Sequence, residues 1–533
     1  MKSRPFRLAA PLLATFATCA AAAPPADLDA RIETAMQQHG VPGLAIAIVE
    51  DGEVALARGY GVRRLGGREP VDADTIFPTG STGKAFTAAA LAVLVDEGKL
   101  GWDDPVADHL PDFRMADPWV TRELTVRDLL VHRSGLGLGA GDLLYVPRTS
   151  RSRADVVRAL RHIEAKTSFR SGYAYDNILY VVAGQLVEAV SGRSWEDFVL
   201  ERLLRPAGMR HATTTLDARF ANANRAQPHA RIDGALRGLG RQQVLDEKDG
   251  LGQTAAPAGG LAASANDLAR WLQVQLAQGA IPGAQGGDPA RLFSEAAARE
   301  MWTPQVLVPI RPFPEPIADA TPQFQSYALG WSVQDYRGVK VVQHGGAVFG
   351  VLTFVVLVPQ EDVGIAITIN SEDVHVLRGI GNELLDHYLG LPDAQHDWVA
   401  DFAQWNAARL KAGADALAAA AAGVVKGGRG RPSLPLAAYA GDYADAWYGP
   451  IGVAFEGGRL RLDFTQSPGM VATLSHHRHD TFRADWDDEA IEPAYVTFSL
   501  DAEGKVARIT MKAVSPTADF SYNYQDLEIL PAR

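Results

Sequence analysis

The chain has 533 residues, 47% of them hydrophobic and 21% charged, which is the composition of an ordinary globular protein with about two to four domains. Its formal net charge is -12, so there is no excess of basic residues to neutralise phosphate groups. This balance argues against nucleic acid or an anionic membrane surface as a partner.

The N-terminal segment has the pattern of a secretory signal peptide. Three basic residues precede the apolar run 8–22, which ends in small residues and is too short to span a membrane. We expect residues 1–23 to be removed, leaving a periplasmic or secreted protein without a transmembrane segment. The single cysteine, Cys19, lies inside this segment, so the mature chain would have no disulfide and no cysteine ligand. Lipoprotein anchoring through Cys19 is disfavoured, because the preceding residues Phe16-Ala17-Thr18 are a poor match to a lipoprotein signal.

Strand signals stand at both ends of residues 29–395, and helical signals lie between them. The predicted strands 43–49 and 53–60 flank Asp51-Gly52, which is a strong two-residue hairpin signal. This order predicts an α+β fold, in which distant parts of the chain close one antiparallel sheet flanked by helices, with a helical subdomain. Helices are expected at 29–39, 178–190 and 195–203, and later strands at 329–334, 340–343, 352–358 and 363–370.

The amino-acid composition changes in the last part of the chain. Residues 396–435 contain an alanine run followed by Gly427-Gly428-Arg429-Gly430, which predicts a helical, Ala- and Gly-rich linker. Beyond it, short strand candidates alternate with glycine-containing turns, so residues 436–533 are predicted to form a separate small β barrel. Whether this domain covers a cleft or mediates assembly stays open.

The segment Thr79-Gly80-Ser81-Thr82-Gly83-Lys84 precedes an apolar run rich in helix formers. If the helix begins near Ser81, then Ser81 and Lys84 lie one turn apart on the same face. A lysine amine that burial keeps neutral can accept the serine proton, and free N–H groups at a helix start can stabilise an oxyanion. A phosphate-binding loop is excluded by Pro78 and Ala85. The alternative is a chance S-x-x-K on an exposed helix, so catalysis needs partners elsewhere.

The first candidate partners are Tyr175 and Asn177, which lie two residues apart in a loop before the predicted helix 178–190. A phenol beside a lysine ammonium can lose its proton more easily and relay it to a leaving group. The Asn177 amide could hold both the lysine and a substrate carbonyl. The alternative is a turn stabilised by asparagine, with a half-buried tyrosine.

The second candidate segment is His344-Gly345-Gly346-Ala347, between two predicted strands. Its glycines would let a substrate backbone approach a strand edge, and the Ala347 N–H could be a second oxyanion donor. His344 could bind a substrate carboxylate when charged, or accept a hydrogen bond when neutral. The alternative is a histidine at the end of a strand with no role.

Ser81-Thr82-Gly83-Lys84, Tyr175-Asp176-Asn177 and His344-Gly345-Gly346, in this order, resemble the three motifs of the serine β-lactamase and penicillin-binding-protein family. The similarity is greatest to its class C-like branch of esterases, D-aminopeptidases and D,D-carboxypeptidases, which is peptidase family S12. It covers about residues 29–395. The C-terminal segment Tyr439-Ala440-Gly441-Asp442-Tyr443 is similar to a small barrel domain appended to some of these hydrolases.

The resemblance implies Ser81 as the acylated nucleophile, Lys84 as its base and Tyr175 as a proton relay. It implies Asn177 as an orienting amide. It also implies an oxyanion hole made by the N–H groups of Ser81 and of Ala347, which follows Gly346.

His344 departs from the family pattern, because many penicillin-recognising members have lysine there. An unperturbed histidine is mostly neutral at pH 7, so it lacks the full positive charge that binds a substrate carboxylate. The departure favours amidase, aminopeptidase or esterase activity on D-amino-acid peptides or small esters. The β-lactamase or D,D-carboxypeptidase activity is the alternative.

No metal or cofactor is expected for a serine ester mechanism, and the expected partner is a small molecule or peptide. His477 and His479 would share one face of a strand, as metal ligands do, but no acidic pattern adjoins them, so a polar strand edge is expected. A non-catalytic ligand-binding or sensor protein with the same fold is the competing class. A pure binder would not need the full set of motif residues, and the oligomeric state is not indicated.

Overall fold

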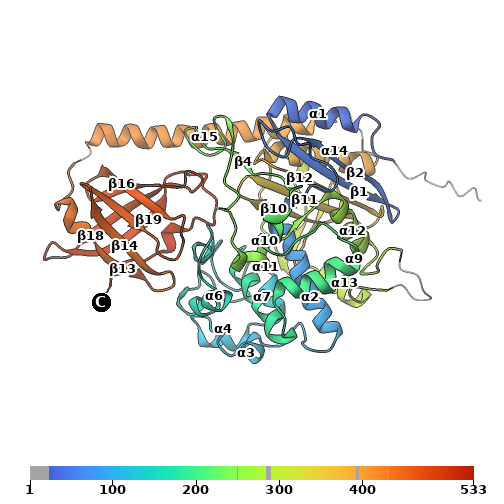
Figure 1. The fold of residues 1–533 in the computed structure, drawn as a ribbon, viewed down its shortest axis with the longest axis horizontal. Coiled ribbons are helices and arrows are strands. Elements are labelled where there is room, and N and C mark those ends of the chain that lie inside the picture. Colours follow the sequence, from blue (N-terminus) through green and yellow to red (C-terminus); the bar gives the residue numbers. More distant parts are fainter. Residues whose placement is uncertain (1–22, 249, 284–289, 392–394, 429, 533) are drawn as a thin grey trace, which may run out of the picture.

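The computed structural model describes residues 23–532 apart from 249, 284–289, 392–394 and 429, so residues 1–22 of the predicted signal peptide lie outside it. Figure 1 shows a helix-covered sheet and a small barrel, with the long helix α15 (Trp398–Gly427) reaching from the first toward the second. Helix α15 occupies most of the predicted linker. None of the helices in the described ranges has the length and hydrophobicity needed to cross a membrane.

The central sheet has eight antiparallel strands in the order β2-β1-β12-β11-β10-β9-β8-β7. Its first strands pair with a strand from far along the chain, because Leu44 lies opposite Ile369. The predicted closure of one antiparallel sheet by distant segments is therefore confirmed. The strands are β1 (Gly43–Glu50), β2 (Glu53–Gly61), β7 (Val306–Leu307), β8 (Gln325–Tyr327), β9 (Ser332–Tyr336), β10 (Val339–Val348), β11 (Val351–Val358) and β12 (Val363–Ile369).

The β1–β2 hairpin turns where the sequence predicts it. Asp51 and Gly52 have φ angles of 50° and 76°, the left-handed pair that a tight two-residue turn requires. Strand β1 is buried on both faces, with Leu44, Ile46 and Ile48 on one side and small or β-branched residues on the other. Alternation of side chains along the strand thus supplies two separate hydrophobic cores.

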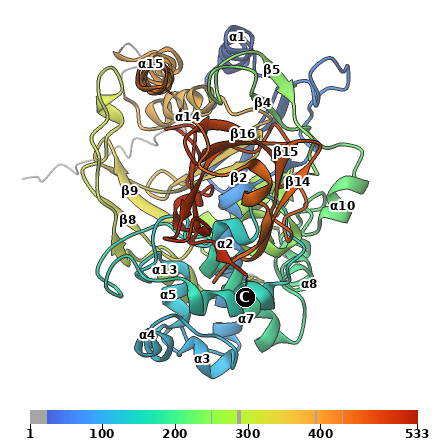
Figure 2. The same cartoon turned by 90° about the vertical axis from the view of Figure 1, so that its left-hand side faces the viewer.

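Helices cover both faces of the sheet (Figures 1 and 2). Helices α1 (Leu28–His39) and α14 (Val374–Tyr388) pack on the Leu44 face, and α2 (Lys84–Asp96) and α12 (Ala265–Leu276) pack on the other. Phe86 of α2 stacks on Trp271 of α12, with ring centroids 3.9 Å apart. The remaining helices are α3 (Val106–His109), α4 (Pro118–Glu123), α5 (Val126–Leu130), α6 (Arg153–Ala159), α7 (Ile178–Ser191), α8 (Trp195–Val199), α9 (Arg205–Ala207), α10 (Leu216–Ala221), α11 (Ala256–Gly259) and α13 (Glu295–Met301).

The C-terminal body is an antiparallel sheet of eight strands that nearly closes into a barrel, as predicted. A bridge between Ile509 and Ile529 brings its two edge strands together. Closure leaves little unpaired edge, which protects a small sheet from pairing with other chains. The strands are β13 (Gly441–Asp445), β14 (Gly449–Glu456), β15 (Arg459–Asp463), β16 (Val471–Arg478), β17 (Thr481–Trp486), β18 (Ala494–Leu500), β19 (Val506–Ala513) and β20 (Leu530–Pro531).

Helix α7 packs against α11 through Gly184. A Cβ atom at Gly184 would lie 2.1 Å from Cγ of Pro257, whose rigid ring cannot move aside easily. This contact sets the spacing between two helices that both reach the candidate site described below.

We predict that Gly184→Ala lowers the free energy of unfolding by about 1–3 kcal/mol, because overpacking outweighs the higher helix propensity of alanine. The matched control is Gly423→Ala in α15, where a Cβ would meet nothing within 4 Å. That variant is expected to stabilise the helix by up to about 1 kcal/mol. Chemical denaturation of both variants checks the prediction, and equal stabilisation by both would contradict it.

Candidate active site

Ser81 and Lys84 lie in a tighter turn than the sequence predicts. Residues Gly80–Gly83 form a 3₁₀ helix that leads directly into α2 at Lys84, so the helix does begin near Ser81, but its first turn is a 3₁₀ helix. Gly80 has a φ angle of 53°, and a Cβ there would lie 2.6 Å from the Ala347 nitrogen, so close packing shapes this turn. With three residues per turn, a 3₁₀ helix places residues i and i+3 in line. Lys84 Nζ accordingly lies 3.0 Å from Ser81 Oγ.

The Lys84 side chain is completely buried. Its Nζ atom lies 2.7 Å from Asn177 Oδ1 and 2.8 Å from the Ala258 carbonyl oxygen, in addition to Ser81. Burial lowers the pKa of Lys84 from 10.5 to about 7, although the buried carboxyl groups of Asp142 and Asp176 act in the opposite direction. A substantial fraction of the amine is therefore neutral at pH 7, and the neutral amine can accept the Ser81 proton.

Asn177 is held by the carboxyl group of Asp142, for which the sequence analysis predicted no role. It stands at the N-cap of α7, and its Nδ2 donates to Asp142 Oδ2 at 2.9 Å. Because a carboxylate accepts hydrogen bonds, this contact sets the amide orientation and directs Oδ1 toward Lys84. Asp142 is fully buried, and desolvation raises its pKa to about 6.

The Tyr175 ring lies beside the lysine, with Lys84 Nζ 4.9 Å from its centroid. Its hydroxyl is buried and has no hydrogen bond of normal geometry to the residues that the structure describes. The Ser81 hydroxyl lowers the pKa of Tyr175, but burial has the larger effect and holds that pKa well above its usual value. Tyr175 therefore stays protonated near neutral pH, contrary to the expectation that the lysine eases loss of its proton. His132 is buried against Tyr175, with ring centroids 4.2 Å apart.

His344 is buried in the same region, and both of its ring nitrogens have partners. Nε2 lies 2.8 Å from the Tyr327 hydroxyl, and Nδ1 lies 2.6 Å from the Gly345 carbonyl oxygen. Nδ1 must carry the proton that is donated to this carbonyl, so Nε2 accepts from Tyr327. Burial, aided by the Lys84 charge, lowers the pKa of His344 to about 3. At pH 7 the imidazole is neutral, and the charged form that would attract a carboxylate is not populated.

Gly346 and Ala347 lie within strand β10, whereas the sequence placed them between two strands. The pairing of β10 with β9 ends at Gln343, so the strand continues beyond it with a free edge, next to the Ser81 turn. A Cβ on Gly346 would lie 2.1 Å from the Thr79 carbonyl oxygen. Glycine therefore permits the close approach that brings this edge to the nucleophile.

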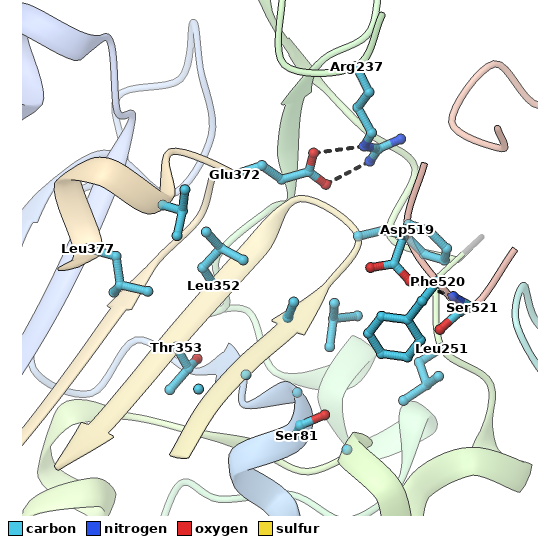
Figure 3. A pocket seen from close by; sticks show the side chains of 18 of the residues that line it. Ser81, Arg237, Leu251, Leu352, Thr353, Glu372, Leu377, Asp519, Phe520 and Ser521 are labelled. Carbon is cyan, nitrogen blue, oxygen red and sulfur yellow. Dashed lines mark hydrogen bonds and ion pairs between the residues drawn. The ribbon is translucent and has the colours of Figure 1, made fainter. Parts of the chain in front are cut away.

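These residues open onto a cavity of about 620 Å³ between the sheet, α15 and the barrel. Ser81, Tyr175, Asn177 and the segment from His344 to Ala347 line it, as do Phe520 and Ser521 from the barrel domain. Figure 3 shows the Phe520 ring directed into the cavity on the side of Ser81. The sequence contained no signal for this contribution, because the barrel segment and the Ser81 motif are separated by most of the chain.

The His477 and His479 pair does not form a metal centre within the described part of the chain. There, no group of three or more histidine, cysteine or acidic side chains is placed to hold a metal ion. Strand β16 ends at Arg478, and its register shifts after His476. The His477 ring packs against Tyr495 with centroids 4.4 Å apart.

Comparisons with known proteins find matches to both parts of the chain. The β-lactamase family model matches residues 28–390, and a domain of unknown function, DUF3471, matches residues 426–531. An unguisins hydrolase of Aspergillus violaceofuscus is 28% identical over 477 residues, covering 86% of this chain and 82% of its own. Penicillin-binding protein 4 of Amycolatopsis lactamdurans is 30% identical over 353 residues, covering 64% of this chain and 84% of its own.

Solved structures extend the likeness of fold to the barrel. The octameric penicillin-binding protein homologue from Pyrococcus abyssi has a TM-score of 0.58 at 20% identity, covering 95% of this chain and 99% of its own. SurE has a TM-score of 0.53 at 22% identity, covering 95% of this chain and 98% of its own. With the family model spanning residues 28–390, the chain belongs to the β-lactamase family, whose relatives include hydrolases and penicillin-binding proteins.

Proposed function

We propose that this chain is an exported serine hydrolase that cleaves amide or ester bonds through an acyl-enzyme on Ser81. The observation that carries the proposal is the buried Lys84 amine, whose pKa is about 7 and whose Nζ lies 3.0 Å from Ser81 Oγ. A lysine with an ordinary pKa would remain an ammonium at pH 7 and could not take the serine proton. Fully buried lysines without a charge partner in contact are rare, which favours a catalytic role.

The proposed reaction has two steps of acyl transfer. Ser81 Oγ attacks the substrate carbonyl carbon while its proton passes to Lys84, and the N–H groups of Ser81 and Ala347 stabilise the resulting oxyanion. The tetrahedral intermediate collapses, and its leaving group takes a proton delivered through Lys84 and Tyr175. Water then attacks the Ser81 ester, gives its proton to Lys84, and releases the acid with the serine hydroxyl restored.

The proposed substrates are peptides containing D-amino acids or small esters. The neutral state of His344 supports a substrate that does not need a fixed cation at this position. The similarity to proteins named as unguisins hydrolases supports hydrolysis as the class of reaction. The alternative, a β-lactamase or D,D-carboxypeptidase, is favoured by the similarity to penicillin-binding protein 4. A non-catalytic binding protein is the competing class.

We expect a fluorophosphonate probe to label the wild-type protein stoichiometrically and to leave Ser81→Ala unlabelled. Lys84→Ala should label about 10²- to 10⁴-fold more slowly, which is the usual contribution of a general base. Intact protein mass spectrometry follows the labelling, and circular dichroism confirms that both variants remain folded. Equal labelling of wild type and Ser81→Ala would remove Ser81 from the mechanism and favour the binding protein.

The acylation rate should rise between pH 6 and pH 8 and level off above. The neutral amine is the active base, and its fraction increases as the pH passes the Lys84 pKa of about 7. The measurement uses a neutral acyl probe, so that ionisation of the probe does not contribute. A rate that keeps rising through pH 10 would indicate an ordinary lysine and contradict the proposed base.

We expect D-aminoacyl amides, D-aminoacyl esters or p-nitrophenyl esters to be turned over faster than a chromogenic cephalosporin or a D-Ala-D-Ala peptide. The reason is that the last two carry a carboxylate, for which neutral His344 supplies no charge. Comparison of kcat/KM across this panel checks the prediction. Ser81→Ala serves as the background control, and preferred turnover of the cephalosporin would favour the β-lactamase alternative.

A further inference from the structure

The barrel domain reaches the candidate active site through the segment of residues 515–524, called here the barrel loop. Phe520 of this loop packs edge-to-face against Tyr175, with ring centroids 5.8 Å apart. The Phe520 carbonyl lies so close to Gly139 that a Cβ there would be 2.7 Å from its oxygen. Figure 3 places Phe520 and Ser521 at the cavity near Ser81. The barrel loop is therefore in contact with the catalytic residues themselves.

Ser521 of the barrel loop hydrogen-bonds to the carboxyl group that orients Asn177. Its Oγ lies 2.7 Å from Asp142 Oδ2, although the two residues are 379 positions apart in the chain. Asp142 also accepts from Asn177 Nδ2 at 2.9 Å and from the Tyr145 hydroxyl at 2.5 Å. Since Asp142 is completely buried, these three donors take the place of water around it. One of the three comes from the other domain.

A continuous set of contacts thus links the barrel to the nucleophile. Ser521 donates to Asp142, Asp142 accepts from Asn177, and Asn177 Oδ1 lies 2.7 Å from Lys84 Nζ. If the Asn177 amide were reversed, its Nδ2 would face Lys84 and its oxygen would face the carboxyl group. Asp142 prevents this reversal as long as its carboxyl group can accept the hydrogen bond from Asn177 Nδ2. It can do so when it is ionised, or when it is protonated but turns its unprotonated oxygen toward the amide.

We propose that Ser521 is a positioning residue for the proposed acyl transfer, and that the barrel domain is part of the catalytic site. Ser521 acts through Asp142 and Asn177 on the lysine base, not on the substrate. The inference rests on the proposed function, because it assigns Ser521 a role in acylation of Ser81. It also gives the β barrel a task beyond covering the cleft.

Docking of the barrel does not depend on Ser521 alone. Thr149 Oγ1 donates to the Gln466 carbonyl at 3.0 Å, and Arg237 Nη1 donates to the Ala490 carbonyl at 2.7 Å. Lys166 and Asp526 form a further ion pair at 3.4 Å. These contacts lie outside the network around Asp142, so the barrel is expected to remain docked when the Ser521 hydroxyl is removed.

The test measures phosphonylation of Ser81 by a neutral fluorophosphonate in the full-length protein, because this reaction also needs Lys84 to take the serine proton; the rate is separated into the maximal rate constant and the half-saturating probe concentration. Ser521→Ala is expected to lower the rate constant by about 10- to 100-fold, the rate equivalent of one hydrogen bond to a charged group. The half-saturating concentration should stay within about twofold, because the Ser521 hydroxyl is committed to Asp142. The matched control Thr149→Val loses a hydrogen bond between the domains at a different place and should react with the probe at the wild-type rate.

Two further comparisons separate positioning from a loss of packing. Threonine and valine side chains have the same shape, but only threonine carries a hydroxyl group. Ser521→Thr should therefore retain most of the rate, and Ser521→Val should not. In a double-mutant cycle, Ser521→Ala should add little to the loss caused by Asp142→Asn, because both changes break the same link. Melting temperatures of all variants show whether any loss of rate comes from unfolding.

The outcomes distinguish this inference from the proposed function. A labelled wild type with an unchanged rate in Ser521→Ala, equal rates for the Thr and Val variants, or losses that multiply in the cycle would each overturn the role of Ser521 and leave the function standing. A wild-type protein that resists the probe altogether would overturn the proposed function and this inference with it. Slow reaction of the probe with Ser521→Ala and Ser521→Val, and fast reaction with Thr149→Val and Ser521→Thr, would support both.

Discussion

The rest of the site depends on the burial of one amine. Loss of water lowers the pKa of Lys84 by an amount that corresponds to roughly 5 kcal/mol against the charged form. A neutral amine has two N–H donors and one lone pair, which match Asn177 Oδ1, the Ala258 carbonyl and the Ser81 hydroxyl. An ammonium can donate to the same three oxygens. The proton can therefore pass between Ser81 and Lys84 with little movement of the heavy atoms.

Two buried carboxyl groups limit how far burial lowers the pKa of Lys84. Asp142 and Asp176 both raise the pKa of Lys84, and burial in turn raises their own pKa values to about 6 and about 7. The lysine is thus poised where it can both accept a proton from Ser81 and return it to a leaving group. Asp142 has a second task, because it sets the orientation of the Asn177 amide.

Close contacts at glycines bring the separate segments of the site together. A Cβ on Gly259 would lie 2.8 Å from the Gly80 carbonyl carbon, and one on Gly346 would lie 2.1 Å from the Thr79 carbonyl oxygen. The Ser81 turn is therefore held between α11 and the free edge of β10. This arrangement requires glycine at these positions, because side chains there would keep the backbones apart.

Features that depend on neighbouring residues could be predicted before the fold was known. The left-handed pair Asp51-Gly52 predicted the hairpin, hydrophobic patterns predicted most strands of the central sheet, and the spacing of Ser81 and Lys84 placed both in one turn. The protonation states of His344 and Tyr175 could be assigned only from the folded protein, because burial by distant segments sets their pKa values. The tertiary structure alone joined Asp142 to Ser521, two ordinary polar residues without a local signal. Interactions between residues that are close in sequence can be inferred from the sequence, whereas desolvation and long-range hydrogen bonds exist only once the chain has folded.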